Sequence, residues 1–172
     1  GQCIHLKKNK KVFAIMVVYS FGLIANIIKL KKISKKFKIP VIADAACSLG
    51  SKYNNKAIGE IGIDISTISF NGNKAMTCGS GGAIISNNSK YLKKAHYYCS
   101  NAREKYEYTY NDIGFNYRMN NLQAAVGLAQ IENINFFINK KNKIKNFYKK
   151  NIKLENKNIL FLPEKKNFLS TC

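Results

Sequence analysis

Apolar runs and helical patterns alternate along the first half of the chain. Residues 12–18 form a continuous apolar run rich in β-branched side chains, a pattern typical of an inner strand that is covered on both faces of a parallel sheet. Apolar positions recur at helical spacing over residues 24–38, and Ile39-Pro40 then ends the helix. A second apolar run at residues 41–44 completes a predicted βαβ unit.

Two further strands are predicted in the middle of the chain. Residues 45–50 can form a short turn, and residues 52–59, which contain the Asn54-Asn55 pair, predict an exposed loop or hairpin. The third strand is expected at residues 63–70 and the fourth at residues 83–86. About a dozen residues separate these two strands, which is near the lower limit for a crossover helix, so we expect the fourth strand to run antiparallel to its neighbours.

The second half of the chain has mainly helical patterns. Residues 91–102 predict a helix, and residues 106–117, which are rich in tyrosine, predict an irregular loop. Residues 121 to about 150 form a long helical pattern, in which apolar side chains recur along one stripe. The last twenty residues, in this interpretation, begin a further segment. Alternating strands and helices indicate the α/β fold class.

Composition limits the size and the environment of the protein. The chain has 172 residues and is 46% hydrophobic, enough for one compact domain with a core but short for a complete two-domain enzyme. The five cysteines are irregularly spaced and form no CxxC pair, which argues against a disulfide framework or a zinc site. No apolar run reaches the eighteen or so residues of a membrane span, and no secretory signal precedes the first strand. We therefore expect a reducing, cytoplasmic location and no bound metal.

A formal net charge of +20 suggests an anionic partner such as nucleic acid. Lysine, however, supplies 27 of the 29 basic residues, and these lysines are spread along the chain together with 22 asparagines. An A/T-rich coding genome produces such joint enrichment without selection for binding, whereas sites that read or stack bases favour arginine and interleaved aromatic side chains. We therefore interpret the charge as compositional and keep a basic nucleic-acid-binding module as the alternative.

Two segments place reactive side chains at predicted strand ends. Ligands of open α/β sheets bind beyond the carboxyl ends of the strands, and both Asp44 and the segment Ser69-Phe-Asn-Gly-Asn-Lys74 follow such ends. This segment puts a hydroxyl, two amides and a flexible glycine ahead of an amine, and the glycine-rich run at residues 79–82 lets backbone approach a ligand closely. Asp44 could pair with a cationic ring nitrogen, or it could instead cap the turn that follows it.

Four sequence blocks resemble the DegT/DnrJ/EryC1/StrS family of sugar-nucleotide aminotransferases, which are pyridoxal 5'-phosphate (PLP) enzymes of fold type I. The blocks lie in order between roughly residues 12 and 135, and four blocks at matching separations are far more specific than any one of them. They are VIADAACSLG at residues 41–50, ISFNGNK at 68–74, GSGGA at 79–83 and DIGFNYRMNN at 112–121. The resemblance implies a three-layer α/β sandwich with a mostly parallel sheet.

Carried over by position, the resemblance implies roles for individual residues. Lys74 matches the lysine that holds PLP as a Schiff base and then moves a proton between substrate and cofactor, and Asp44 matches the aspartate that pairs with the pyridine nitrogen. Ser69 matches the phosphate-binding serine. Asn116 matches the asparagine that reaches the phosphate of a neighbouring subunit's cofactor, which implies a homodimer with shared active sites.

The chain also departs from the family pattern. Cys47 stands in the cofactor site near O3', where the family usually has glutamine or glutamate, and Ala43 precedes the aspartate where an acidic residue is common. The family's N-terminal phosphate turn with its stacking aromatic ring, and its C-terminal small domain, have no counterpart here. We therefore expect residues 1–135 to be part of the PLP-binding large domain, residues 136–172 to be a long helix tail with the start of the small domain, and activity of this fragment alone to be reduced or absent.

The leading hypothesis is a PLP-dependent aminotransferase that transfers an amino group, from glutamate as is usual in the family, to a nucleotide-linked 4-keto-6-deoxy sugar in surface polysaccharide or glycan biosynthesis. The ISFNGNK block resembles members that aminate C4 of UDP- or GDP-linked sugars. A PLP sugar dehydratase is a second hypothesis within the same fold, but those members have histidine in place of Lys74. The third is a non-catalytic fragment that is degenerate or binds nucleic acid.

Overall fold

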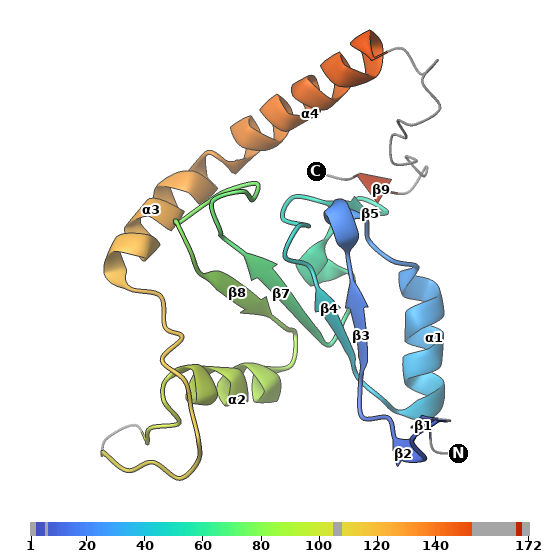
Figure 1. Cartoon of the computed structure of the whole chain (residues 1–172), viewed down its shortest axis with the longest axis vertical. Helices are drawn as coiled ribbons and strands as arrows, with labels where there is room; N and C mark the ends of the chain where they lie inside the picture. The colour runs from blue at the N-terminus through green and yellow to red at the C-terminus, as the bar shows by residue number, and fades with distance from the viewer. Residues whose placement is uncertain (1–2, 6, 105–107, 153–167, 170–172) are drawn as a thin grey trace.

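A computed structural model describes residues 3–5, 7–104, 108–152 and 168–169 of the chain. A four-stranded sheet in the order β3-β4-β7-β8 lies at its centre (Figure 1). The parallel strands are β3 (Ile15–Val18), β4 (Val41–Asp44) and β7 (Ile65–Ser69), and β8 (Gly82–Ile85) runs antiparallel to β7. The expected mixed α/β fold and the antiparallel fourth strand are therefore confirmed.

Helix α1 (Ile27–Phe37) makes the crossover between β3 and β4. Asn26 caps its N-terminus, because the side-chain Oδ1 accepts a hydrogen bond from the Lys29 backbone N–H at 3.1 Å. The helix ends at Lys38, which adopts a left-handed conformation with φ of 53° and lies just before Ile39-Pro40. Local signals thus set both ends of the helix, and the βαβ unit is present as predicted.

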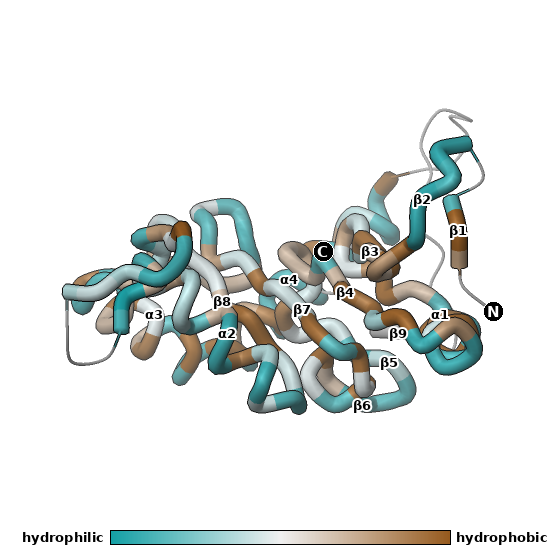
Figure 2. The backbone as a smooth tube through the Cα atoms, turned by 90° about the horizontal axis from the view of Figure 1, so that it is seen from below, coloured by the Kyte–Doolittle hydropathy of each residue, from teal (hydrophilic) through white to brown (hydrophobic). Residues whose placement is uncertain are grey.

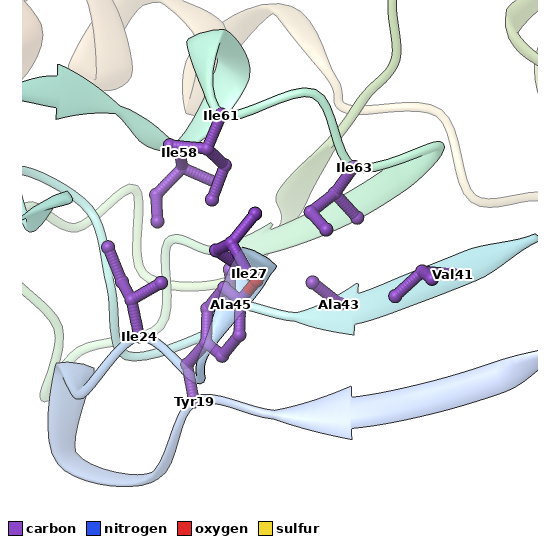
Figure 3. Close-up of a cluster of buried hydrophobic side chains, with 9 residues drawn as sticks. All are labelled: Tyr19, Ile24, Ile27, Val41, Ala43, Ala45, Ile58, Ile61 and Ile63. Atoms are coloured by element: carbon purple, nitrogen blue, oxygen red, sulfur yellow. The ribbon is translucent and has the colours of Figure 1, made fainter. Parts of the chain in front are cut away.

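The hydrophobic core lies on the face of the sheet that α1 covers (Figure 3). Side chains alternate between the two faces of a strand, and in β4 this alternation buries Val41 and Ala43, while Ile42 and Asp44 face the other side and are half-buried. Figure 2 shows the hydrophobic residues along the central strands. The core cluster consists of Tyr19, Ile24, Ile27, Val41, Ala43, Ala45, Ile58, Ile61 and Ile63.

Strand β3 lies at the edge of the sheet, so the prediction of an inner strand covered on both faces is wrong for the described residues. Ile15 and Val17 pack against the core, whereas Met16 and Val18, on the other face, are 70% and 58% exposed. A continuous apolar run indicates a strand whose two faces both favour burial. It does not identify which part of the chain, or which other molecule, covers each face. Within the described part of the chain, β4 alone pairs with β3.

Residues 52–59, predicted as an exposed loop or hairpin, include a hairpin. Strands β5 (Lys52–Tyr53) and β6 (Lys56–Ala57) pair antiparallel and are joined by a two-residue turn. Asn54 and Asn55 both have positive φ, 49° and 61°. Asparagine tolerates this conformation better than most residues, and two consecutive positive φ angles match the twist of the flanking strands.

Several short elements were not predicted. Strands β1 (Ile4–His5) and β2 (Lys10–Lys11) form a hairpin ahead of β3, and Ser20–Gly22 forms the 3-10 turn η1 after it. Strand β9 (Phe168–Leu169) pairs with β5, far away in sequence. The other residues of the segment expected at the end of the chain lie outside the described residues.

Helix α2 (Ser89–Cys99) confirms the helix predicted at residues 91–102, and Asn88 caps its first turn. The irregular segment that follows turns back against the C-terminus of this helix, where Ser100 and Asn116 form an isolated antiparallel bridge. Figure 1 places this segment beside α2, at the end of the sheet opposite to the loop between β7 and β8.

The long helical pattern predicted over residues 121 to about 150 forms two helices, α3 (Asn121–Glu132) and α4 (Ile134–Asn151). They meet at Asn133, whose φ of −103° and ψ of 11° depart from helical values. Its side-chain Nδ2 donates a hydrogen bond to the Ala129 carbonyl oxygen at 2.9 Å. Asparagine side chains compete in this way for the helix backbone, so the predicted helical pattern is present but is divided at this residue.

Both helices expose large apolar side chains to solvent. The exposed residues are Leu122, Val126, Leu128, Ile131, Phe136, Ile144, Phe147 and Tyr148. The apolar stripe predicted for this segment is therefore not part of the core of the described chain. Among the described helices, none is long and apolar enough to span a membrane.

Candidate functional site

Asp44 ends β4 on the face of the sheet opposite to the core. It pairs in register with Val18 of β3 and Thr67 of β7, so the three side chains form one row across the sheet. The Asp44 Oδ1 accepts a hydrogen bond from the Ala46 backbone N–H at 3.1 Å, which confirms that this residue caps the following turn. Within the described chain no hydrogen bond reaches Oδ2, and the half-buried carboxylate can therefore also bind a cationic donor.

Ser69 and Lys74 lie at the start of the loop between β7 and β8. Ser69 is the last residue of β7, and its Oγ accepts a hydrogen bond from the Asn71 backbone N–H at 3.2 Å. Farther along, the Thr77 hydroxyl donates to the Phe70 carbonyl oxygen at 3.1 Å and closes the loop on itself. Lys74 therefore leaves the sheet at the carboxyl end of β7, as predicted from the sequence.

The Lys74 amine lies against Cys47. Its Nζ donates a hydrogen bond to Cys47 Sγ at 3.1 Å, and both side chains are half-buried. Cys47 follows Asp44 by three residues in the turn after β4. The structure thus brings the amine to the turn that carries the carboxylate.

Helix α3 supports the Lys74 loop through two glutamines. Gln130 Oε1 accepts a hydrogen bond from the Thr77 backbone N–H at 3.4 Å. Gln123 Nε2 donates to Ser80 Oγ at 2.5 Å. These contacts restrain the loop, and neither glutamine is among the residues predicted from the sequence.

A glycine lets α3 approach this loop. A Cβ on Gly127 would lie 2.8 Å from Cys78 Sγ, closer than packed atoms are found. Gln123, Gly127 and Gln130 are spaced by four and three residues, which places them on one face of the helix. This spacing of polar and small residues, beside the apolar positions of α3, is the sequence signal that could have predicted the contact between the helix and the Lys74 loop.

Asn116 lies apart from the other candidate residues. Its bridge to Ser100 holds it beside the C-terminus of α2. A polar cavity of about 340 Å³ lies there, and neither Asp44 nor Lys74 lines it. The lining residues are His96, Ser100, Asn101, Arg103, Glu104, Asn116 and Arg118. One copy of the chain therefore gathers Asp44, Cys47, Ser69 and Lys74 at the strand ends but leaves Asn116 elsewhere.

A larger cavity of about 740 Å³ lies between the sheet and α2. Thr67, the register neighbour of Asp44, lines one side of it together with the start of β8, and Gln123 lines another. Most other lining side chains are apolar or neutral, and His96 and Arg118 are shared with the smaller cavity. The volume is within the range that small-molecule ligands occupy.

Two tyrosines have raised pKa values. Burial raises the pKa of Tyr19 to about 12, because its ring is in the core and its hydroxyl has no hydrogen-bond partner among the described residues. The Tyr98 hydroxyl donates a hydrogen bond to Asp112 Oδ2 at 2.7 Å. This bond raises the pKa of Tyr98 and lowers the pKa of Asp112.

The groups at the strand ends suit a ligand with an aldehyde, a basic ring nitrogen and an anionic group. The Lys74 amine can condense with a carbonyl carbon, and the Asp44 carboxylate can stabilise a protonated ring nitrogen. The Ser69 hydroxyl and the backbone of the glycine-containing loop can donate to an anion. The described residues include no cluster of three potential metal ligands.

Comparison with known protein sequences finds relatives for most of the chain. The model of the DegT/DnrJ/EryC1/StrS aminotransferase family matches residues 4–170. GDP-perosamine synthase of Escherichia coli O157:H7 is 40% identical over 150 residues, which cover 87% of this chain and 41% of the relative. EpsN of Bacillus subtilis (strain 168), whose name includes the words pyridoxal phosphate-dependent aminotransferase, is 37% identical over 137 residues, which cover 79% of this chain and 35% of the relative.

Solved structures share the fold. Helicobacter pylori PseC, described as an aminotransferase involved in the biosynthesis of pseudoaminic acid, superposes with a TM-score of 0.75 at 30% identity. The match covers 80% of this chain and 38% of that one. The chain thus spans less than half the length of the curated relatives it matches.

Proposed function

Because the chain belongs to the DegT/DnrJ/EryC1/StrS aminotransferase family, we propose that it carries part of the cofactor-binding domain of a pyridoxal 5'-phosphate-dependent aminotransferase. The observation that carries this proposal is the 3.1 Å contact between Lys74 Nζ and Cys47 Sγ, which brings an amine to the turn after Asp44. PLP requires an amine for its aldehyde and a carboxylate for its ring nitrogen, and Lys74 and Asp44 supply this pair at one end of the sheet.

Each residue has a chemical task in this proposal. Bound PLP supplies a ring that accepts the electron pair released when a proton leaves the α-carbon of the amino donor. Lys74 would hold the cofactor through its amine, and the same amine would take up a proton as general base and return one as general acid. Asp44 keeps the ring nitrogen protonated through its carboxylate. Ser69 binds the phosphate group, and Cys47 lies beside the amine.

The proposed substrate is a nucleotide-linked 4-keto-6-deoxy sugar, and the proposed amino donor is glutamate. The relative with 40% identity is named for a GDP-linked amino sugar, which supports a sugar nucleotide as the acceptor. The cavity of about 740 Å³ beside Thr67 provides space for such a molecule next to the Asp44 row. We propose that this reaction serves surface polysaccharide or glycan biosynthesis and takes place in the cytoplasm.

We also propose a homodimer in which Asn116 of one copy completes the site of the other. The bridge to Ser100 holds Asn116 at the C-terminus of α2, in a cavity that neither Asp44 nor Lys74 lines, and this separation supports a role for Asn116 in the site of a second copy. In this proposal residues 1–135 belong to the large domain, and residues 136–172 lead into a small domain.

The direct test is PLP binding to the full chain. The expected result is a visible absorption band of lysine-bound cofactor, which borohydride then fixes as a phosphopyridoxyl group that peptide mass spectrometry locates on Lys74. Attachment spread over many lysines would contradict a dedicated site. Absence of the band, together with tight and salt-sensitive binding of nucleic acid, would support the non-catalytic alternative.

A further inference from the structure

The Lys74 amine and the Cys47 thiol form a pair whose chemistry goes beyond amino transfer. We propose that the pair is an oxidative modification site, at which a peroxide links Cys47 Sγ to Lys74 Nζ through a reversible sulfur–nitrogen bond, a sulfenamide. The observation behind the proposal is the hydrogen bond from Nζ to Sγ at 3.1 Å. Sulfenic acids condense with thiols or with nearby nitrogen atoms, so the identity of the neighbour decides the product.

The geometry favours nitrogen as that neighbour. The separation of 3.1 Å between Nζ and Sγ lies within the roughly 3–3.5 Å at which reacting atoms are already in a near-attack arrangement. The turn after β4 is held by the hydrogen bond between Asp44 and Ala46. The Lys74 loop is closed by the bond from Thr77 to Phe70. Bond formation therefore requires little movement of either backbone.

The burial of the pair fits a small oxidant. Both side chains are half-buried, so a peroxide molecule can reach the sulfur while a bulky thiol is hindered. Of the other described cysteines, Cys78 is buried against α3. Cys99 is half-buried in the wall of the large cavity and is therefore the matched control thiol.

The reaction balances as two steps. Hydrogen peroxide first converts the Cys47 thiol to a sulfenic acid and releases one water, so the sulfur loses two electrons and the peroxide gains them. The lone pair on Lys74 Nζ then attacks the sulfur, the S–OH bond breaks, and the hydroxyl leaves as a second water with a proton from the amine. Two equivalents of a small thiol reverse the link, restoring the cysteine and the amine and forming one small-molecule disulfide.

The consequence for cofactor binding rests on the proposed function. An amine bonded to sulfur cannot bind the PLP aldehyde, so oxidation would block attachment and a reducing thiol would restore it. Prior attachment of PLP would protect the amine and leave Cys47 to form the sulfenic acid alone. The modification would thus respond both to peroxide and to cofactor occupancy.

The test uses the full chain without cofactor. The protein is treated with one equivalent of hydrogen peroxide, digested without reductant, and analysed by mass spectrometry. We expect a linked species that joins the peptides of Cys47 and Lys74, is lighter than their sum by two hydrogens, and disappears on treatment with dithiothreitol. Cys47→Ser and Lys74→Arg should abolish this species, whereas Cys99→Ser should retain it.

Specific results would overturn the proposal. They are oxidation of Cys47 with Lys74 unmodified, a link that retains an oxygen atom, or a disulfide from Cys47 to another cysteine as the main product. Because the assay contains no PLP, its failure is separate from failure of the proposed function. A linked species in a chain that does not bind PLP would leave the modification site standing and overturn the cofactor role alone.

Discussion

Lys74 Nζ donates a hydrogen bond to Cys47 Sγ at 3.1 Å, although the two residues are 27 positions apart in the sequence. The bond joins the turn after β4 to the loop after β7, which are adjacent parallel strands. Parallel neighbours bring their carboxyl ends to the same edge of a sheet. The position of the amine is therefore set by tertiary structure, and substitutions in either loop should change what the amine binds.

Lys74→Ala should eliminate covalent PLP binding, because the substitution removes the proposed attachment point. The measurement is the visible absorption band of the wild-type and variant chains with PLP, followed by borohydride reduction and peptide mapping. Lys56→Ala, at an exposed position of strand β6, is the matched control for the loss of one positive charge. An unchanged yield of reduced cofactor in Lys74→Ala would disprove the assignment.

Asp44→Asn should weaken PLP binding by about 10- to 100-fold, since a hydrogen bond to a charged partner contributes about 1.5–3 kcal/mol. Without the carboxylate, the ring nitrogen of bound PLP should also be less fully protonated. This change would shift the absorption spectrum of the bound cofactor. Equilibrium titration with PLP gives the affinity. Glu132→Gln, an exposed carboxylate on α3, is the control, and equal affinities for the two variants would count against a role for Asp44.

Mixing two defective variants should restore cofactor sites if the sites are shared. Lys74→Ala lacks the proposed attachment point, and Asn116→Ala lacks the proposed phosphate ligand. A heterodimer of these two chains contains one site with both residues intact. Tight PLP binding should therefore appear only after the two proteins are mixed and allowed to exchange subunits. If the mixture binds no more than the average of its components, Asn116 does not act across an interface.

Tyr19→Phe should stabilise the chain by about 1 kcal/mol, because it removes a buried hydroxyl that has no hydrogen-bond partner among the described residues. The measurement is the free energy of unfolding in urea. The pKa of Tyr19 is raised to about 12 in the folded state, above the value of about 10 in an unfolded chain. Ionisation of the Tyr19 hydroxyl therefore favours the unfolded chain. The part of the free energy of unfolding that depends on a neutral Tyr19 is fully present below about pH 10 and is lost as the pH rises through about 12.

The same variant tests the pH dependence. Between pH 10 and 12 the stability of the wild type should fall more steeply than that of Tyr19→Phe, and the difference between the two proteins cancels the effect of the lysines. Parallel curves over this range would show that the tyrosine titrates normally in the folded chain.

Gly82→Ala should destabilise the fold by about 1–3 kcal/mol, because the added Cβ would overlap the Ile68 carbonyl oxygen on the neighbouring strand β7. Gly72→Ala is the matched control, since a Cβ at Gly72 meets nothing within 4 Å. Its expected effect on the free energy of unfolding is close to zero or slightly stabilising. Thermal unfolding of both variants distinguishes them, and equal midpoints would contradict the tight approach of β8 to β7.

Local sequence signals predicted the elements of the fold well. Ile39-Pro40 follows the end of α1 and the Asn54-Asn55 pair forms the hairpin turn, because chain-breaking and turn preferences act over a few residues, whereas the Asn26 cap was not predicted. Strand order was harder to predict. The apolar run that becomes β3 could not reveal an edge position, and the pairing of β9 with β5 joins distant parts of the chain.

The candidate site, like the fold, could be predicted from the sequence only in part. Asp44 and Lys74 could be selected because strand ends and a family resemblance both point to them. The contact between Lys74 and Cys47 depends on side-chain rotamers and on the path of two loops, which no local pattern encodes. The support from α3 was missed for a related reason, since the glutamine contacts arise from the packing of the helix against the loop.

Within the described residues, β3 pairs with a strand on one side only, and this edge position bears on how the chain behaves in concentrated solution. Its backbone pairs with β4 on one side, and the exposed Met16 and Val18 leave one face of an uncharged apolar run open to solvent. Such an edge can accept a strand from a second molecule, and repeated addition leads to aggregation. Self-association through this strand, rather than loss of folding, would then limit the concentration at which the isolated chain stays dispersed.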